Sequence, residues 1–134
     1  MPLIKKFEDI RAWQEARILN KSIYSLTQNE PFAKDWGLRQ QIQRASVSIM
    51  TNIAEGFDCE SRKEFARFLT IARRSAVEVQ SLLYTALDVG YISQDSFEMH
   101  YAQARKTISL IGALRHSLRQ RPERAPQEHK NINT

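Results

Sequence analysis

The sequence predicts an all-α protein that folds as an antiparallel, up-down-up-down four-helix bundle. Four long segments repeat apolar residues at steps of three and four, which is the spacing of one face of an α-helix. Only four glycines and four prolines occur in 134 residues, which disfavours a many-turned β fold. Because the connections are short, each helix is expected to run antiparallel to the next. We expect residues 1–120 to form this single domain.

The first helix is predicted over residues 7–27. Its inner face is apolar at helical spacing and consists of Ile10, Trp13, Ala16, Leu19, Ile23 and Leu26. The run of Asn29, Glu30 and Pro31 then ends the helix.

The second helix is predicted over residues 37–57, with Asp35 as its N-cap and Gly56 as a left-handed stop. One apolar stripe of this helix comprises Leu38, Ile42, Ala45, Ile49 and Ile53. Neighbouring side chains widen the apolar arc to about 200°, more than one bundle core requires. We therefore predict that these neighbours contact other copies of the chain: Val47, Met50, Ala54 and Phe57.

A polar strip follows the same helix, within a sector roughly 80° wide. It consists of Gln41, Arg44, Ser48, Asn52 and Glu55. In the first interpretation the strip is a structural network that fixes the register of the bundle or a subunit contact. In the second it is a binding site with alternating donors and acceptors. The structural interpretation is favoured, because buried polar groups persist where they are satisfied.

The third helix begins at a capping box, in which Ser61 is followed by Glu64, and it ends at Gly90. Its apolar residues alternate steps of four and three, as in a heptad seam: Phe65, Leu69, Ala72, Ala76, Val79, Leu83 and Ala86.

The fourth helix restarts the chain at Ser93 and Asp95 and carries a similar seam. Leu114 is expected to replace Arg115 in that seam, and Gly112 to mark a close helix contact. The remaining seam residues are Phe97, Tyr101, Ala104, Ile108, Ile111 and Leu118. Residues 121–134 are polar and non-periodic and contain two prolines, so they are expected to form a disordered tail.

Basic residues exceed acidic ones, giving a net charge of +5, and the excess lies in the second half of the chain. The candidate nucleic-acid-binding residues lie on the third and fourth helices: Arg62, Lys63, Arg67, Arg73, Arg74, Arg115 and Arg119. The alternative is a solvated or interface face whose cations offset a helix dipole.

Catalytic and metal-binding motifs are largely absent, so we predict a non-enzymatic protein without cofactor or metal. No Glu-x-x-His motif for a di-iron site and no glycine-rich phosphate loop occur. The three histidines are expected on the surface. The single Cys59 excludes an internal disulfide and favours a cytoplasmic location. No apolar run is long enough to span a membrane.

Three blocks of the chain carry a family resemblance. The first block, in the first helix, consists of Phe7, Ile10, Trp13, Ala16 and Tyr24. The other two are the segment GLRQQIQRASVSIMTNIAEGF at 37–57 and FARFLTIARRSAVEVQ at 65–80. Across residues 7–118 the chain resembles the small four-helix-bundle proteins encoded in intervening sequences of bacterial 23S rRNA genes. One departure is Arg74, where the family tends to have glycine.

That family is similar in fold to accessory proteins of diversity-generating retroelements, which form pentameric rings that bind nucleic acid and a reverse transcriptase. The resemblance therefore implies a homopentameric ring, a non-enzymatic scaffold and a nucleic-acid-binding surface.

Three hypotheses for function follow. The first is a self-assembling scaffold that binds RNA or DNA through a basic surface of the oligomer. The second is a protein–protein adaptor without nucleic-acid binding. The third is an unusual RNase that uses the Arg124 and His129 pair, which stands on no predicted helix.

Overall fold

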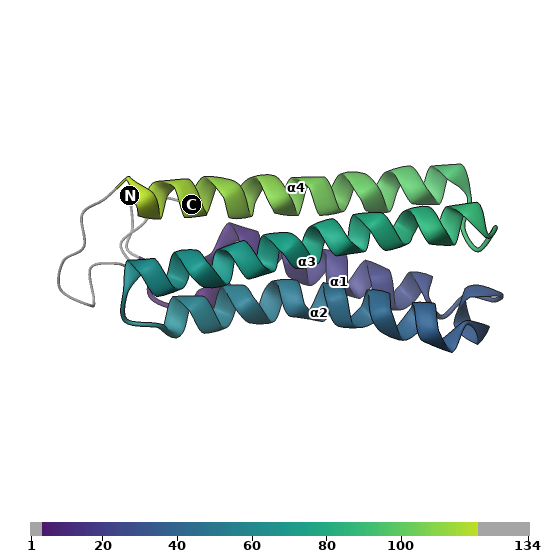
Figure 1. Cartoon of the computed structure of the whole chain (residues 1–134), viewed down its shortest axis with the longest axis horizontal. Helices are drawn as coiled ribbons and strands as arrows, with labels where there is room; N and C mark the ends of the chain where they lie inside the picture. Colours follow the sequence, from purple (N-terminus) through teal and green to yellow (C-terminus); the bar gives the residue numbers. More distant parts are fainter. Residues whose placement is uncertain (1–3, 121–134) are drawn as a thin grey trace.

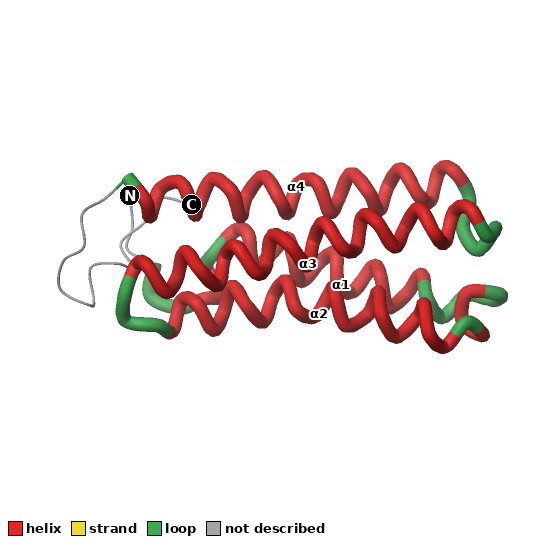
Figure 2. The backbone as a smooth tube through the Cα atoms, viewed as in Figure 1, coloured by secondary structure: helices red, strands yellow, loops and turns green. Residues whose placement is uncertain are grey.

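A computed structural model of the chain describes residues 4–120, and in this part it contains helices and no strand (Figures 1 and 2). The four long helices are α1 (Arg11–Leu26), α2 (Trp36–Asp58), α3 (Arg62–Asp88) and α4 (Gln94–Arg119). Each contacts the next along the chain, and α1 also contacts α4, so α1 and α3 lie on one diagonal of the bundle. The predicted all-α four-helix bundle is confirmed. The predicted tail at 121–134 lies outside the described residues.

The core is formed by the apolar seams that the periodicity predicted. All seven seam residues of α3 are fully buried, and Ile42, Ile49 and Ile53 of α2 are buried opposite them. In α4, Leu114 is 3% exposed and replaces Arg115 in the seam, as expected.

Three helices begin at side-chain caps. The backbone N–H of Leu38 donates to Asp35 Oδ1 at 3.1 Å, which confirms the predicted cap of α2. Ser61 Oγ accepts from the N–H of Glu64 at 3.0 Å, and Ser93 Oγ accepts from the N–H of Ser96 at 3.1 Å. Just beyond the end of α3, Gly90 has a φ of +81°, the left-handed conformation that favours glycine.

The start of α1 differs from the prediction. Phe7–Asp9 form a separate 3-10 turn, and α1 begins at Arg11. Between them Ile10 has extended backbone and is fully buried. This break brings the ring of Phe7 to 5.1 Å from that of Trp13 in an edge-on contact. Burial of Ile10 and this ring contact therefore override the helical periodicity of the segment.

Both glycine predictions inside helices are wrong. Gly56 does not end α2, which continues to Asp58; instead, a Cβ at Gly56 would lie 2.7 Å from Phe68 Cβ. Gly56 therefore permits the close approach of α2 to α3. A Cβ at Gly112 would meet nothing within 4 Å, so this glycine marks open space and no helix contact.

Candidate nucleic-acid interface

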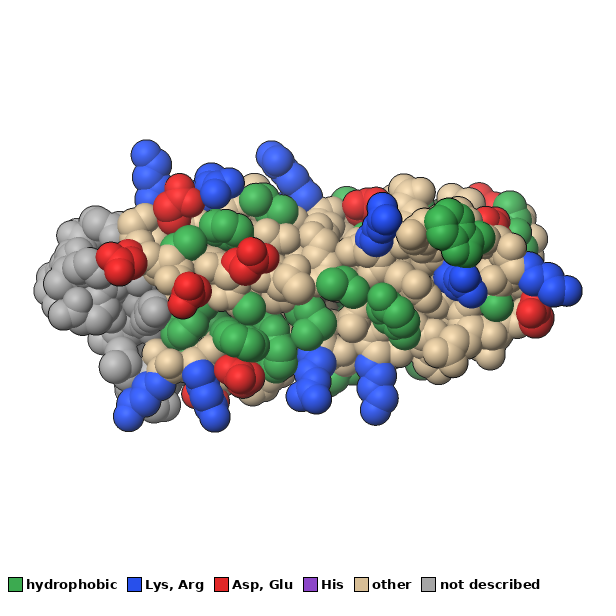
Figure 3. Space-filling model, turned by 90° about the horizontal axis from the view of Figure 1, so that it is seen from below, with side chains coloured by type: hydrophobic (Ala, Val, Ile, Leu, Met, Phe, Trp, Pro, Cys, Tyr) green, Lys and Arg blue, Asp and Glu red, His purple; other side chains and the backbone are tan. Residues whose placement is uncertain are grey.

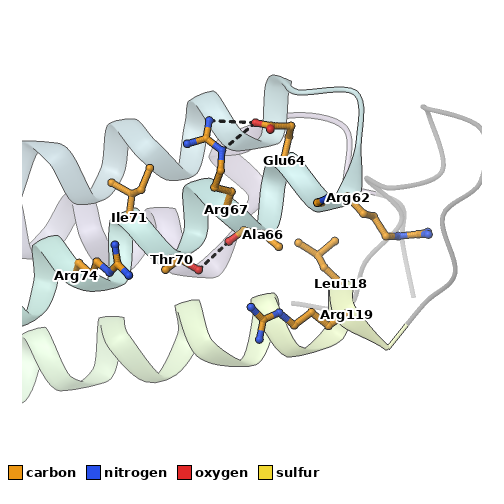
Figure 4. A pocket seen from close by; sticks show the side chains of 10 residues that line it. Arg62, Glu64, Ala66, Arg67, Thr70, Ile71, Arg74, Leu118 and Arg119 are labelled. Carbon is orange, nitrogen blue, oxygen red and sulfur yellow. Dashed lines mark hydrogen bonds and ion pairs between the residues drawn. The ribbon is translucent and has the colours of Figure 1, made fainter.

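A groove of about 710 Å³ lies between the first half of α3 and the end of α4 (Figure 4). Five basic residues line it: the buried Arg62 and four others, Lys63, Arg67, Arg74 and Arg119. These four others are all exposed. Between them lie the apolar side chains of Ala66, Ile71 and Leu118. We call this site the basic groove.

Arg67 is held in place at the rim of the basic groove. Its Nε and Nη2 atoms both donate to Glu64 Oε2, at 3.2 and 3.1 Å. Its guanidinium carbon also lies 4.8 Å from the centre of the Phe68 ring. The side chain remains 57% exposed. A ligand can therefore reach this cation, although Glu64 offsets part of its charge.

Arg115 joins α4 to α3 beside the basic groove. Its Nη1 donates to Thr70 Oγ1 at 3.0 Å, and Thr70 Oγ1 in turn donates to the carbonyl oxygen of Ala66 at 3.1 Å. This contact uses only part of the donor capacity of the guanidinium. Arg115 thus adds positive charge at a fixed position.

The structure brings together most of the predicted basic residues, with two exceptions. Arg73 is exposed on α3 but does not line the basic groove. Arg62 borders the groove, but it is only 5% exposed and extends away from the other labelled arginines (Figure 4). The assignment of Arg62 to the exposed basic surface is corrected, because a ligand in the groove can reach little of a buried side chain.

The polar strip of α2 faces α3. Ser48 Oγ lies 2.9 Å from Ser75 Oγ, and Asn52 Nδ2 donates to Ser48 Oγ at 3.0 Å. Gln41 Nε2 donates to Glu78 Oε2 at 3.4 Å. The two remaining members of the strip, Arg44 and Glu55, are exposed. The centre of the strip is therefore a hydrogen-bonded link between two helices.

Sequence reasoning missed Ser75, the α3 partner in this link. The spacing of Ser75 on α3 could have identified it, because it stands three residues before Glu78 and so lies on the same side of the helix, which faces α2.

Arg44 lies beside a second depression of about 490 Å³, between α2 and α3.

The apolar arc of α2 is divided between the core and the surface. Val47, Met50 and Ala54 are each partly exposed; we call these three the α2 apolar face. On the side of the bundle shown in Figure 3, hydrophobic side chains gather between Lys and Arg side chains, mainly over the half where α2 ends. The prediction that Phe57 contacts other copies is corrected. Phe57 is 5% exposed, and its ring packs edge-on against that of Phe65 at 5.9 Å between centroids, so it belongs to the core of the monomer.

Cys59 and His100 each have a backbone carbonyl as hydrogen-bond partner. Partial burial, followed by the nearby carboxylates of Glu64 and Asp58, raises the pKa of the Cys59 thiol. The thiol is therefore protonated at neutral pH and a poor nucleophile. His100 was expected on the surface but is 4% exposed, and its Nδ1 donates to the carbonyl oxygen of Ser96 at 2.7 Å.

Metal binding and membrane insertion find no support in the described part. Across residues 4–120, no three His, Cys, Asp or Glu side chains gather closely enough to hold a metal ion. In the same range, none of the helices combines the length and the apolar character needed to cross a membrane. The Arg124 and His129 pair lies outside the described residues.

A solved structure from Bacteroides thetaiotaomicron is similar to this fold. It is described as a protein with unknown function from the S23 ribosomal protein family. The two superpose with a TM-score of 0.73 at 22% sequence identity, over 78% of this chain and 95% of the other. At this identity the likeness shows the fold alone.

No curated protein matches the chain. The model of the 23S rRNA-intervening sequence protein family matches residues 8–113, which include nearly all of the four helices. Apart from Phe7, this range contains the three blocks that carried the resemblance. The chain therefore belongs to the 23S rRNA-intervening sequence protein family.

Proposed function

We propose that this protein is a non-enzymatic, self-assembling helical scaffold that binds RNA or DNA through the basic groove. One observation carries the proposal: four exposed cations from two helices, Lys63, Arg67, Arg74 and Arg119, line one groove. Among the described lining residues, Glu64 is the one carboxylate, and it is engaged by Arg67. The local charge is thus strongly positive.

A phosphate backbone suits this arrangement. Arginine presents planar, fixed donors that match phosphate oxygens, and it remains charged at any physiological pH. Each phosphate that a cation neutralises releases condensed counterions, which drives association. In an assembly of identical subunits, several copies of the basic groove would share one polyanion and bind it more tightly than a single copy.

The residue types in the basic groove support a scaffold better than a nuclease. Acid–base cleavage of a phosphodiester needs a positioned group that gives and takes a proton near neutral pH. Among the described residues that line the groove, none is a histidine or a cysteine, and the one carboxylate, Glu64, is engaged by Arg67. The arginines do not deprotonate, so they hold an anion without transferring a proton.

The test is fluorescence anisotropy with labelled RNA and DNA over a range of salt concentrations. The logarithm of the affinity should fall with the logarithm of salt concentration by about 0.7 to 0.9 per phosphate contacted. Arg67→Gln and Arg119→Gln should each weaken binding and reduce this slope.

The matched control is Arg11→Gln, because Arg11 is an exposed cation on α1, diagonally opposite α3. This variant should bind as the wild type does. An affinity that ignores salt, or equal losses in all three variants, would overturn the proposal.

A protein–protein adaptor is the second candidate, and large exposed apolar side chains favour it. Trp36 is 63% exposed at the start of α2, and Val89 is 55% exposed just after α3. Both lie at the end of the bundle opposite the basic groove, because neighbouring helices are antiparallel. Gently purified protein without absorbance from nucleic acid, and without binding at low salt, would favour the adaptor.

A further inference from the structure

We call the line along which α3 and α4 contact each other on the surface of the bundle the outer seam. Along this line the two helices keep one register beyond the basic groove. Two contacts define it: the hydrogen bond from Arg115 to Thr70, and the ring contact of Tyr84 with Tyr101 at 5.7 Å between centroids. Thr70 and Tyr84 are fourteen residues apart on α3, and so are Tyr101 and Arg115 on α4. The antiparallel helices therefore face each other without a slip between these points.

The middle of this seam is open. In the same register Arg73 of α3 stands opposite Gly112 of α4, because Arg73 comes three residues after Thr70 and Gly112 comes three residues before Arg115. A Cβ at Gly112 would have no neighbour within 4 Å. Arg73, which does not line the basic groove, therefore lies beside an unfilled part of the same seam.

The far end of the seam presents aromatic rings together with a cation. Tyr84 is 49% exposed, although its ring lies 4.7 Å from that of Phe97. The guanidinium carbon of Arg105 lies 5.1 Å from the centre of the Tyr101 ring. Between this end and the basic groove, Val77 is 43% exposed. The outer seam thus presents a cluster of cations at the basic groove, and aromatic rings with a single arginine at its far end.

We infer that this whole seam, from Arg67 to Tyr84, binds one single strand of nucleic acid, with Tyr84 as a stacking platform for a base. The inference rests on the proposed function and deepens it. The seventeen residues between these positions span about 26 Å at 1.5 Å per residue. That length matches about seven nucleotides at the 3.4 Å stacking distance, or fewer in an extended strand.

A single strand fits the aromatic end better than a duplex. In a duplex the faces of the bases are covered by their neighbours, so a ring such as Tyr84 cannot reach them. In a single strand every base offers a free face, and stacking on an aromatic ring is tolerant of sequence. The arginines at the other end hold the phosphates, and together the two ends distinguish an unpaired strand from a paired one.

The experiment compares three labelled probes by anisotropy at low salt: a twelve-nucleotide single strand, a duplex of the same sequence, and an abasic strand with the same backbone. The wild type should bind the single strand most tightly. Tyr84→Leu keeps an apolar side chain against Phe97 but removes the aromatic face. It should lose about tenfold in affinity for the single strand and almost nothing for the duplex or the abasic strand.

Tyr84→Phe is the control, because it keeps the ring and should bind as the wild type does. Circular dichroism melting must show that both variants remain folded. If Tyr84→Leu binds the single strand normally while Arg67→Gln still weakens binding, the stacking inference is overturned and the proposed function stands. If no probe binds at low salt, both are overturned. Equal wild-type affinity for the strand and the duplex would also overturn the inference.

Discussion

Gly56 and Gly112 have opposite surroundings, although both are glycines inside helices. At Gly56 a methyl group would meet Phe68 Cβ at 2.7 Å and Phe65 Cδ1 at 3.0 Å. Phe68 Cβ is attached directly to the backbone, so it cannot swing away without moving α3. At Gly112 the same methyl group would enter open space. The same substitution therefore has opposite expected effects at the two positions.

Gly56→Ala should lower the free energy of unfolding by about 1–3 kcal/mol, because overpacking forces the two helices apart. Gly112→Ala, the matched control, should raise it by about 0.5–1 kcal/mol through helix propensity. Urea denaturation of the two variants measures both values. A neutral Gly56→Ala would show that α2 and α3 have room to separate there.

Asp35 connects the start of α2 to the segment between α3 and α4. One carboxylate oxygen caps α2, and the other accepts a hydrogen bond from the Tyr91 hydroxyl at 2.9 Å. This hydrogen bond, followed by desolvation and the charge of Asp35, raises the pKa of Tyr91 above its ordinary value of 10.0. The native state therefore keeps the phenol proton to higher pH than the unfolded state does.

The contribution of this contact is fully present below about pH 10 and is lost as pH rises through the raised pKa. Tyr91→Phe lacks both the hydrogen bond and the ionisation. The stability difference between wild type and Tyr91→Phe should thus shrink above about pH 10. Denaturation midpoints at intervals from pH 8 to 11 check this, and a difference that stays constant would contradict it.

At the scale of the element, α2 has three faces that differ in what they contact. Its stripe of isoleucines is buried, its polar strip links to α3, and the α2 apolar face is partly exposed. The polar link is centred on the Ser48 and Ser75 hydroxyls, which are 2.9 Å apart. Neutral hydrogen bonds of this kind typically contribute about 0.5–1.5 kcal/mol.

A double-mutant cycle on Ser48→Ala and Ser75→Ala should therefore show a coupling free energy of about 0.5–1.5 kcal/mol. The control cycle pairs Ser75→Ala with Thr51→Ala, because Thr51 is exposed and donates only to the carbonyl oxygen of Ser48. That cycle should be additive. Equal coupling in both cycles would mean that the effect comes from general loosening of the helices and not from the Ser48–Ser75 contact.

At the scale of the whole molecule, the bundle separates residues that hold the monomer from residues available to other copies. Phe57 is buried against Phe65, so Phe57→Asp should unfold the monomer and would report nothing about assembly. Val47 lies on the α2 apolar face and is partly exposed. A substitution at Val47 therefore tests self-association without removing a core side chain of the monomer.

Val47→Asp should keep the helical circular dichroism spectrum of the wild type but reduce the molar mass measured by light scattering, because a charge would be buried between subunits. Thr51→Asp, also on α2 but outside the α2 apolar face, should keep the wild-type mass. If the wild type is monomeric at high concentration, the assembly part of the proposed function fails, whatever these variants do.

The sequence by itself determined the helices, their order and most of the core. Helical periodicity and capping residues are both local signals: the first placed the α3 seam correctly, and the second placed the Asp35 and Ser61 caps correctly. The sequence prediction also named all five cations that line the basic groove. Residues spaced by three, four and seven share a face of a helix whatever that helix packs against.

The tertiary structure alone decided what each face contacts. Only packing between helices shows that Gly56 admits Phe68 and that Gly112 stands in open space. Packing likewise buries Phe57 and provides Ser75 as the partner of Ser48. These outcomes depend on the register and separation of helices distant in sequence, which a periodic pattern within one helix does not encode.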